Sequence, residues 1–150
     1  MKIKYPILAI DYGSKRIGLA ISDSKGIIAS PLEVLKITKN RGIDNILEDI
    51  LIISEEYRVK TILIGKPQIF KEEYKYSVRK IDRFAQKLTD ITNIPVIFQD
   101  EGYSTNQSQN MLLSLGQNIK SSREKIDMIS ATMFLQEFLN SNYKGNEKSH

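Results

Sequence analysis

Three acidic positions in this 150-residue chain have the residue type and setting to do hydrolytic or metal chemistry. Asp11 ends the first short apolar run of the chain, which is typical of a buried strand. Glu101, with Asp100 before it, ends the last such run. Asp127 lies in the apolar sector of a helical pattern, where an ionised carboxylate costs several kcal/mol unless a cation pairs with it.

Each acid also has an ordinary structural explanation when it is taken alone. Asp11 could bond its own backbone in a turn, and Glu101 could be a solvated loop residue. Asp127 could form a structural ion pair with Arg123 or Lys125. The sequence leaves these alternatives open at each single position.

The combination of the three acids favours a divalent-metal site. If the last helix packs on the sheet near the end of the first strand, Asp11, Glu101 and Asp127 converge. Three crowded carboxylates repel one another unless a cation compensates them, and hard cations such as Mg²⁺ prefer oxygen ligands. Bound Mg²⁺ or Mn²⁺ activates water and stabilises the departing oxygen of a phosphodiester. We therefore take these three residues as candidate catalytic residues and metal ligands.

The composition excludes several other kinds of site. The chain has no Cys, which excludes a disulfide scaffold, a Cys nucleophile and zinc-finger or iron–sulfur sites. Its one His is His150, the last residue, so a His-based triad is implausible. No apolar run approaches the about 20 residues that cross a bilayer, so we expect a cytoplasmic protein without a membrane partner. The net charge of +4 suits an anionic partner without proving one.

Hydrophobic spacing and turn residues predict the element order β-β-β-α-β-α-β-α-α. The expected strands are Ile7–Ile10, Arg16–Ser22, Ile27–Ile37, Thr61–Ile64 and Pro95–Phe98. The expected helices run from a cap at Asn40 to Tyr57, from Tyr74 to Ile91, from Ser104 or Thr105 to about Leu115, and from Ser121–Ser122 to about Leu139.

This order indicates an α/β fold with one mixed five-stranded sheet. The first three strands should form an antiparallel meander, and two parallel strands should follow through helical crossovers that cover both faces. We expect the first strand at the centre and the third at an edge, because Pro31 cannot donate to a ladder. The arrangement resembles the ribonuclease H-like fold. We expect a single domain over residues 1–141 and a disordered polar tail over 142–150.

Four segments resemble the motifs of the YqgF/RuvX family of Holliday-junction-resolvase-like proteins. The segments are Leu8–Asp23, similar to the family's first motif; Ile62–Pro67, similar to its Gly-Leu-Pro strand end; Asp100–Thr105, similar to its Asp-Glu-Arg-Leu-Ser/Thr-Thr motif; and Lys125–Ala131, similar to its closing Asp-Ala-x-Ala-Ala helix. The resemblance implies a ribonuclease H-like fold and a metal-dependent nuclease whose carboxylates are Asp11, Glu101 and Asp127. It also implies a role in maturing the 5′ end of pre-16S rRNA or in cutting branched DNA.

Two departures from the family pattern bear on activity. Gly102 stands where the family usually has Arg, which removes a bidentate phosphate contact. Lys66 replaces the usual Leu and adds a positive charge near the expected site. Lys15, Arg16 and Lys66 are our candidate phosphate contacts, although each could equally be a solvated surface residue.

Three hypotheses of function follow. The first is a nuclease that acts on structured RNA or branched DNA. The second, motivated by Gly102, is a non-catalytic RNA- or ribosome-binding protein. The third is an ATP-binding domain of the actin or sugar-kinase type, which we rank last because such proteins generally close two domains around the nucleotide. A homodimer is one of the oligomeric states that the sequence allows.

Overall fold

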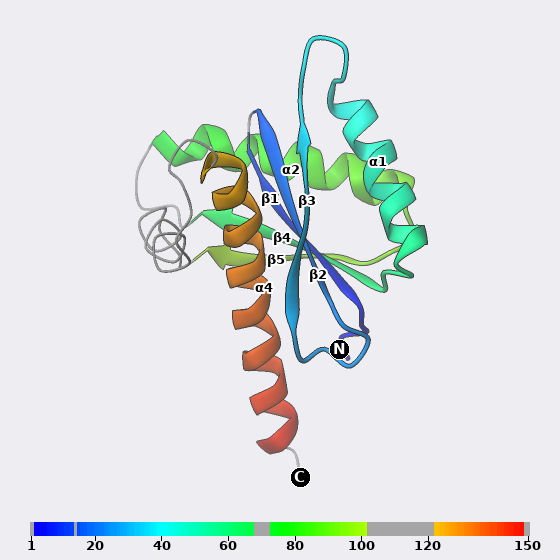
Figure 1. The fold of residues 1–150 in the computed structure, drawn as a ribbon, viewed down its shortest axis with the longest axis vertical. Helices are drawn as coiled ribbons and strands as arrows, with labels where there is room; N and C mark the ends of the chain where they lie inside the picture. The colour runs from blue at the N-terminus through cyan, green and yellow to red at the C-terminus, as the bar shows by residue number, and fades with distance from the viewer. Residues whose placement is uncertain (1, 14, 68–72, 102–121, 149–150) are drawn as a thin grey trace.

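The computed structural model describes residues 2–13, 15–67, 73–101 and 122–148. Its elements are β1 (Ile7–Tyr12), β2 (Arg16–Ser22), β3 (Ala29–Lys36), α1 (Ile43–Glu56), β4 (Thr61–Pro67), α2 (Glu73–Ile91), β5 (Val96–Glu101) and α4 (Ser122–Lys148), as labelled in Figure 1. The predicted order of strands and helices is confirmed for these residues. The short helix predicted from Ser104 or Thr105 to Leu115 lies outside them.

The five strands form one mixed sheet in the order β3-β2-β1-β4-β5. β1 and β3 pair with β2 in antiparallel fashion, whereas β4 is parallel to both β1 and β5. The prediction of a central first strand and an edge third strand is therefore confirmed. Pro31 lies in the edge strand opposite Ala20, beside an irregularity in the β2–β3 register.

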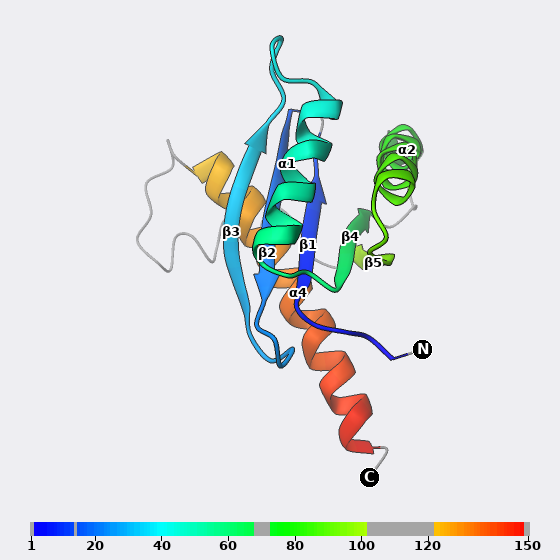
Figure 2. The same ribbon diagram turned by 90° about the vertical axis from the view of Figure 1, so that its right-hand side faces the viewer.

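The helices lie on both faces of the sheet, as predicted: α1 and α2 cover one face and α4 crosses the other (Figure 2). The side chains of β1 divide between the two layers because successive residues of a strand point to opposite faces. Leu8 and Ile10 are buried against α1 and α2, while Ile7 and Ala9 are buried against α4. All four are 0% exposed, so β1 forms the centre of both cores.

α4 is anchored on the sheet by apolar packing and by one side-chain amide. Phe134 and Leu135 are buried against β1, β2 and β4. The Gln136 amide oxygen accepts the N–H of Ala29 at 2.9 Å, and its amide nitrogen donates to the carbonyl of Ile27 at 2.9 Å. These contacts hold α4 so that its first turns lie near the carboxyl end of β1 and its last turns extend beyond the sheet (Figure 1).

The predicted end of α4 near Leu139 is wrong, since the helix continues to Lys148. Leu139 is the last buried residue of the apolar stripe, but backbone hydrogen bonds continue a helix without burial. Within this extension, the Asn142 amide donates to the Phe138 carbonyl at 2.8 Å. The division into a domain over 1–141 and a disordered tail over 142–150 stays a prediction.

The start of α1 differs from the sequence expectation as well. Asn40 is not the N-cap, because it lies in a tight turn in which Thr38 and Arg41 exchange backbone hydrogen bonds of 2.9 and 3.2 Å. Gly42 is the N-cap, and its N–H donates to the Asn45 side chain at 3.1 Å. The Asn45 amide thus satisfies a backbone donor at the helix start.

Gly13 is required where β1 turns into β2. A Cβ atom at this position would lie 2.5 Å from the carbonyl oxygen of Arg16, which is backbone and has little freedom to move away. We expect Gly13→Ala to destabilise the fold by about 1–3 kcal/mol, measured by urea denaturation. Gly42→Ala is the matched control, because nothing lies within 4 Å of its Cβ position. Equal losses in the two variants would contradict this explanation.

Candidate active site

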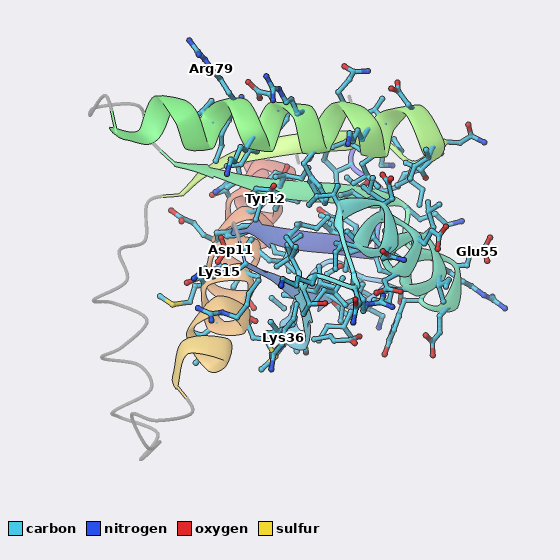
Figure 3. All side chains as sticks on the ribbon, turned by 90° about the horizontal axis from the view of Figure 1, so that it is seen from above. Asp11, Tyr12, Lys15, Lys36, Glu55 and Arg79 are labelled. Atoms are coloured by element: carbon cyan, nitrogen blue, oxygen red, sulfur yellow. The ribbon has the colours of Figure 1, made fainter. Side chains whose placement is uncertain are left out.

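Asp11 lies near the carboxyl end of the central strand, on the face that α4 covers. Its side chain lies on the same face as Ile7 and Ala9, which pack against α4, and it is partly buried. Figure 3 shows Asp11 beside α4, with the neighbouring Tyr12 on the side of α2. The backbone thus sends these two consecutive side chains to opposite faces of the sheet.

Glycines occupy the sheet positions on both sides of Asp11. On β2 its register partner is Gly18, and on β4 Gly65 directly follows Ile64, the partner of Ile10. A side chain directly opposite in a sheet ordinarily lies about 4.5–5.5 Å away and fills the adjacent surface. Neither neighbouring strand therefore contributes a side chain directly beside Asp11.

The candidate phosphate contacts occupy two different places. Lys15 is exposed in the β1–β2 turn and Arg16 begins β2, so both lie close to Asp11 along the chain. Lys66 is instead engaged at the α2 side of the sheet. Its ammonium lies 2.8 Å from the Asp82 carboxylate and 4.4 Å from the centroid of the Phe98 ring. The structure therefore groups Lys15 and Arg16 with Asp11, whereas it pairs Lys66 with Asp82 on the opposite face.

The backbones of Glu101 and Asp127 are described, but their side chains lie outside the described part. Glu101 is the last residue of β5 and pairs with Pro67, at the edge where the parallel strands β1, β4 and β5 all end. Asp127 lies in α4 one helical turn before Ala131, which is buried against the sheet. Among the described side chains, no group of three acids is placed to hold a metal ion, so the convergence of the three carboxylates stays a prediction.

A pocket of about 310 Å³ opens on the other side of the same strand end. Its lining residues are Tyr12, Ile37, Ile43, Lys80, Arg83, Phe84 and Lys87, and we refer to it as the Tyr12 pocket. Burial raises the pKa of the Tyr12 phenol. The bases Lys80, Arg83 and Lys87 are not among the site residues predicted from the sequence. Their spacing of three and four residues, which places them on one stripe of the predicted helix, was the available signal.

In the part of the chain that the structure describes, no helix is long and apolar enough to span a membrane. The family model described as RuvX, Holliday junction resolvase, matches residues 5–141. The chain belongs to the RuvX family. The resemblance found in the four sequence motifs is thereby confirmed, and it covers all five strands of the sheet.

Curated relatives match over nearly the same region. A Rickettsia bellii (strain OSU 85-389) protein is 36% identical over 137 residues, which cover 91% of this chain and 86% of that protein. A Geobacillus kaustophilus (strain HTA426) protein is 35% identical over 134 residues, which cover 89% and 96%. Both carry the name "Putative pre-16S rRNA nuclease". Membership of the RuvX family therefore makes this chain a member of a nuclease family.

Solved structures agree with the fold. The Thermus thermophilus RuvC structure aligns with a TM-score of 0.59 at 15% identity, over 93% of this chain and 97% of that chain. A fowlpox virus resolvase in complex with Holliday junction DNA aligns with a TM-score of 0.56 at 16% identity, over 91% and 98%. At these identities the likeness concerns the fold alone. The predicted resolvase-like, ribonuclease H-like architecture of this RuvX member is confirmed.

Proposed function

We propose that this protein hydrolyses phosphodiester bonds in structured RNA or branched DNA, with a divalent cation held by Asp11, Glu101 and Asp127. The observation that carries the proposal is the setting of Asp11. It is an acid at the end of the central strand, flanked by two glycines and facing the helix that contains Asp127. The curated relatives named as pre-16S rRNA nucleases favour the 5′ end of pre-16S rRNA as the substrate.

Strand register supports the choice of Glu101 as a partner of Asp11. Ile10, Ile64 and Phe98 share one row of the sheet, so Glu101 lies two residues further along the edge than the row of Asp11. Glu101 is two strands across and two residues along from Asp11, which corresponds to about 12 Å between their Cα atoms. Two side chains that bind the same ion can bridge this distance. Alternation also favours position 101 over position 100, because Ile97 packs on the α4 side of β5.

The helical period supports Asp127 in the same way. Positions 127 and 131 are one turn apart on α4, and Ala131 is fully buried in the cluster that contains Ala9 of β1. α4 begins at the edge where β1 ends (Figure 1). An acid one turn closer to that edge than Ala131 is therefore a suitable third ligand for the ion.

The chemistry of this donor set fits a hard cation. All three candidate ligands are carboxylates, which are the oxygen ligands that Mg²⁺ and Mn²⁺ accept. Such an ion, when bound, lowers the pKa of a coordinated water and stabilises the charge of the departing oxygen. The residues of the chain bind and orient the phosphate. Lys15 and Arg16 contribute positive charge beside Asp11. Lys66 lies on the α2 side of the sheet and contacts a phosphate there only if that phosphate displaces Asp82.

A metal titration separates this nuclease from the RNA- or ribosome-binding protein that Gly102 motivates. We expect Mn²⁺ to bind at millimolar concentration or below and to raise the melting temperature, because an ion that binds only the folded state stabilises it. Calorimetry measures the binding, and Ca²⁺ serves as the comparison ion. Absence of any Mn²⁺ binding at millimolar concentration would favour the non-catalytic alternative.

A further inference from the structure

The lining of the Tyr12 pocket combines apolar and cationic side chains. Tyr12 and Phe84 lie with ring centroids 4.9 Å apart, and Ile37 and Ile43 add aliphatic surface. The three bases Lys80, Arg83 and Lys87 lie on the same stripe of α2 as Phe84. The pocket therefore suits a ligand that is flat and apolar at one end and anionic at the other.

The described lining of the pocket is positively charged. Among the residues that the structure describes, none of those lining the pocket is acidic. On α2, Asp82 is held by Lys66 on the β4–β5 side, and Asp90 accepts a hydrogen bond from Gln86 at 2.9 Å. Arg83 and Lys87 thus give the described lining of the pocket a positive charge.

We propose that the Tyr12 pocket binds one unpaired nucleotide of the nucleic acid that the protein cleaves. The base lies against the Tyr12 side, and the adjacent phosphate contacts the stripe of Lys80, Arg83 and Lys87. This proposal rests on the proposed function, because it specifies a feature of the same nucleic-acid substrate. It requires a single-stranded segment next to the bond that is cut.

The position of the pocket explains why this segment lies beside the cleavage point. Tyr12 directly follows Asp11, and their side chains leave the end of β1 on opposite faces. A single strand of nucleic acid that crosses the carboxyl end of β1 therefore contacts Asp11 on one face of the sheet and the Tyr12 pocket on the other.

The Tyr12 ring explains why the nucleotide is unpaired. The pocket of about 310 Å³ has room for a base, and in a stacked duplex the flat face that would lie against Tyr12 is covered by the neighbouring bases. A duplex would have to open before it could enter, at a cost of a few kcal/mol per base. A free nucleotide offers the pocket the same base and phosphate as a nucleotide within an RNA strand. The experiment must therefore distinguish a free nucleotide from an RNA strand.

The test measures binding of a 12-nucleotide single-stranded RNA and of a blunt RNA duplex of the same sequence. Asp11→Asn is the background, which keeps the RNA intact during the measurement. In this background Arg83→Glu is compared with Arg79→Glu, since both change one exposed arginine of α2 by the same charge. Arg79 does not line the pocket and points away from the body of the protein (Figure 3).

We expect Arg83→Glu to weaken binding of the single strand by about tenfold and to reduce the slope of log K against log salt by about 0.7. Arg79→Glu should change the single-strand affinity by less than about threefold, and neither variant should change the affinity for the duplex by more than that. The proposal is overturned if both variants weaken both RNAs equally. It is also overturned if 5′-AMP binds as tightly as the 12-mer, because the occupant is then a free nucleotide.

Failure of this inference is distinguishable from failure of the proposed function. If the protein with Asp11 intact cuts RNA while Arg83→Glu leaves single-strand binding unchanged, only the pocket is wrongly assigned. If no cleavage occurs but Arg83→Glu alone weakens binding, the pocket assignment holds and the hydrolytic proposal fails. Melting temperatures of both variants within a few degrees of the background exclude a folding effect.

Discussion

Asp11→Asn is expected to reduce cleavage by about a thousandfold or more while leaving the fold intact. Asn has the shape of Asp but no charge, so it is a poor ligand for a hard cation. The positions beside residue 11 on β2 and β4 are glycines, so neither adjacent strand supplies a replacement carboxylate in that row. Initial cleavage rates on a labelled precursor RNA in Mg²⁺ measure the effect. Circular dichroism and the melting temperature verify the fold.

Asp23→Asn is the matched control for this prediction. Asp23 also follows a strand end, but β2 is antiparallel to β1, so Asp23 lies at the opposite edge of the sheet. Its carboxylate accepts the N–H groups of Ile28 at 3.0 Å and Ile27 at 2.7 Å, and these bonds lower its pKa. An Asn oxygen accepts the same bonds, so activity should persist. Cleavage that survives Asp11→Asn, or that is lost equally in both variants, would contradict the assignment.

Phe134→Ala is expected to cost about 3–5 kcal/mol of unfolding free energy. Phe134 is 1% exposed and packs between α4 and the sheet, so its removal leaves a cavity in the layer that positions α4. The loss is a large fraction of the about 5–15 kcal/mol of a typical domain. Urea denaturation followed by circular dichroism measures it. Cleavage should fall with the folded fraction.

Two further variants keep this prediction decisive. Phe134→Leu retains most of the buried volume and should cost about half as much or less, which covers the case that Phe134→Ala does not fold. Glu137→Ala changes an exposed position of the same helix and should stay within about 0.5 kcal/mol of the wild type. A loss for Phe134→Ala no larger than that for Glu137→Ala would show that α4 does not depend on this packing.

The sheet could be predicted from the sequence because its determinants are local and strong. Short apolar runs such as Ile7–Ile10 and Ile62–Ile64, each followed closely by turn residues, favour buried strands over longer helices. Pro31 marks the edge, since a proline in the ladder of a central strand leaves an unpaired acceptor. The alternation of strands and helices then determines which pairs are parallel.

The helix ends could not be predicted from the same signals. Asn40 is a better N-cap than Gly42 by intrinsic preference, but Asn40 lies within the Thr38–Arg41 turn and not next to the first residue of α1. The Asn45 side chain instead accepts the hydrogen bond of the Gly42 N–H. Such a choice depends on contacts between residues that compete for the same backbone groups. The end of α4 was missed because the apolar stripe ends at the sheet, whereas the helix does not.

The sequence predicts those site residues whose place follows from their own strand or helix, but not contacts that depend on how several elements pack together. Asp11 follows from its strand, and the structure places it on the face of α4 as the convergence requires. The engagement of Lys66 with Asp82 and Phe98 depends on the register of three elements, which the sequence does not reveal. The Tyr12 pocket likewise arises only when α1, α2 and β1 pack together.

A crystal structure of the protein with Mn²⁺ tests the central claim most directly. Anomalous scattering locates each manganese ion without assumptions about its ligands. We predict an ion bound by the carboxylates of Asp11, Glu101 and Asp127 at metal–oxygen distances of about 2.2 Å. An ion held elsewhere, with these three side chains pointing to separate regions of the molecule, would contradict the account.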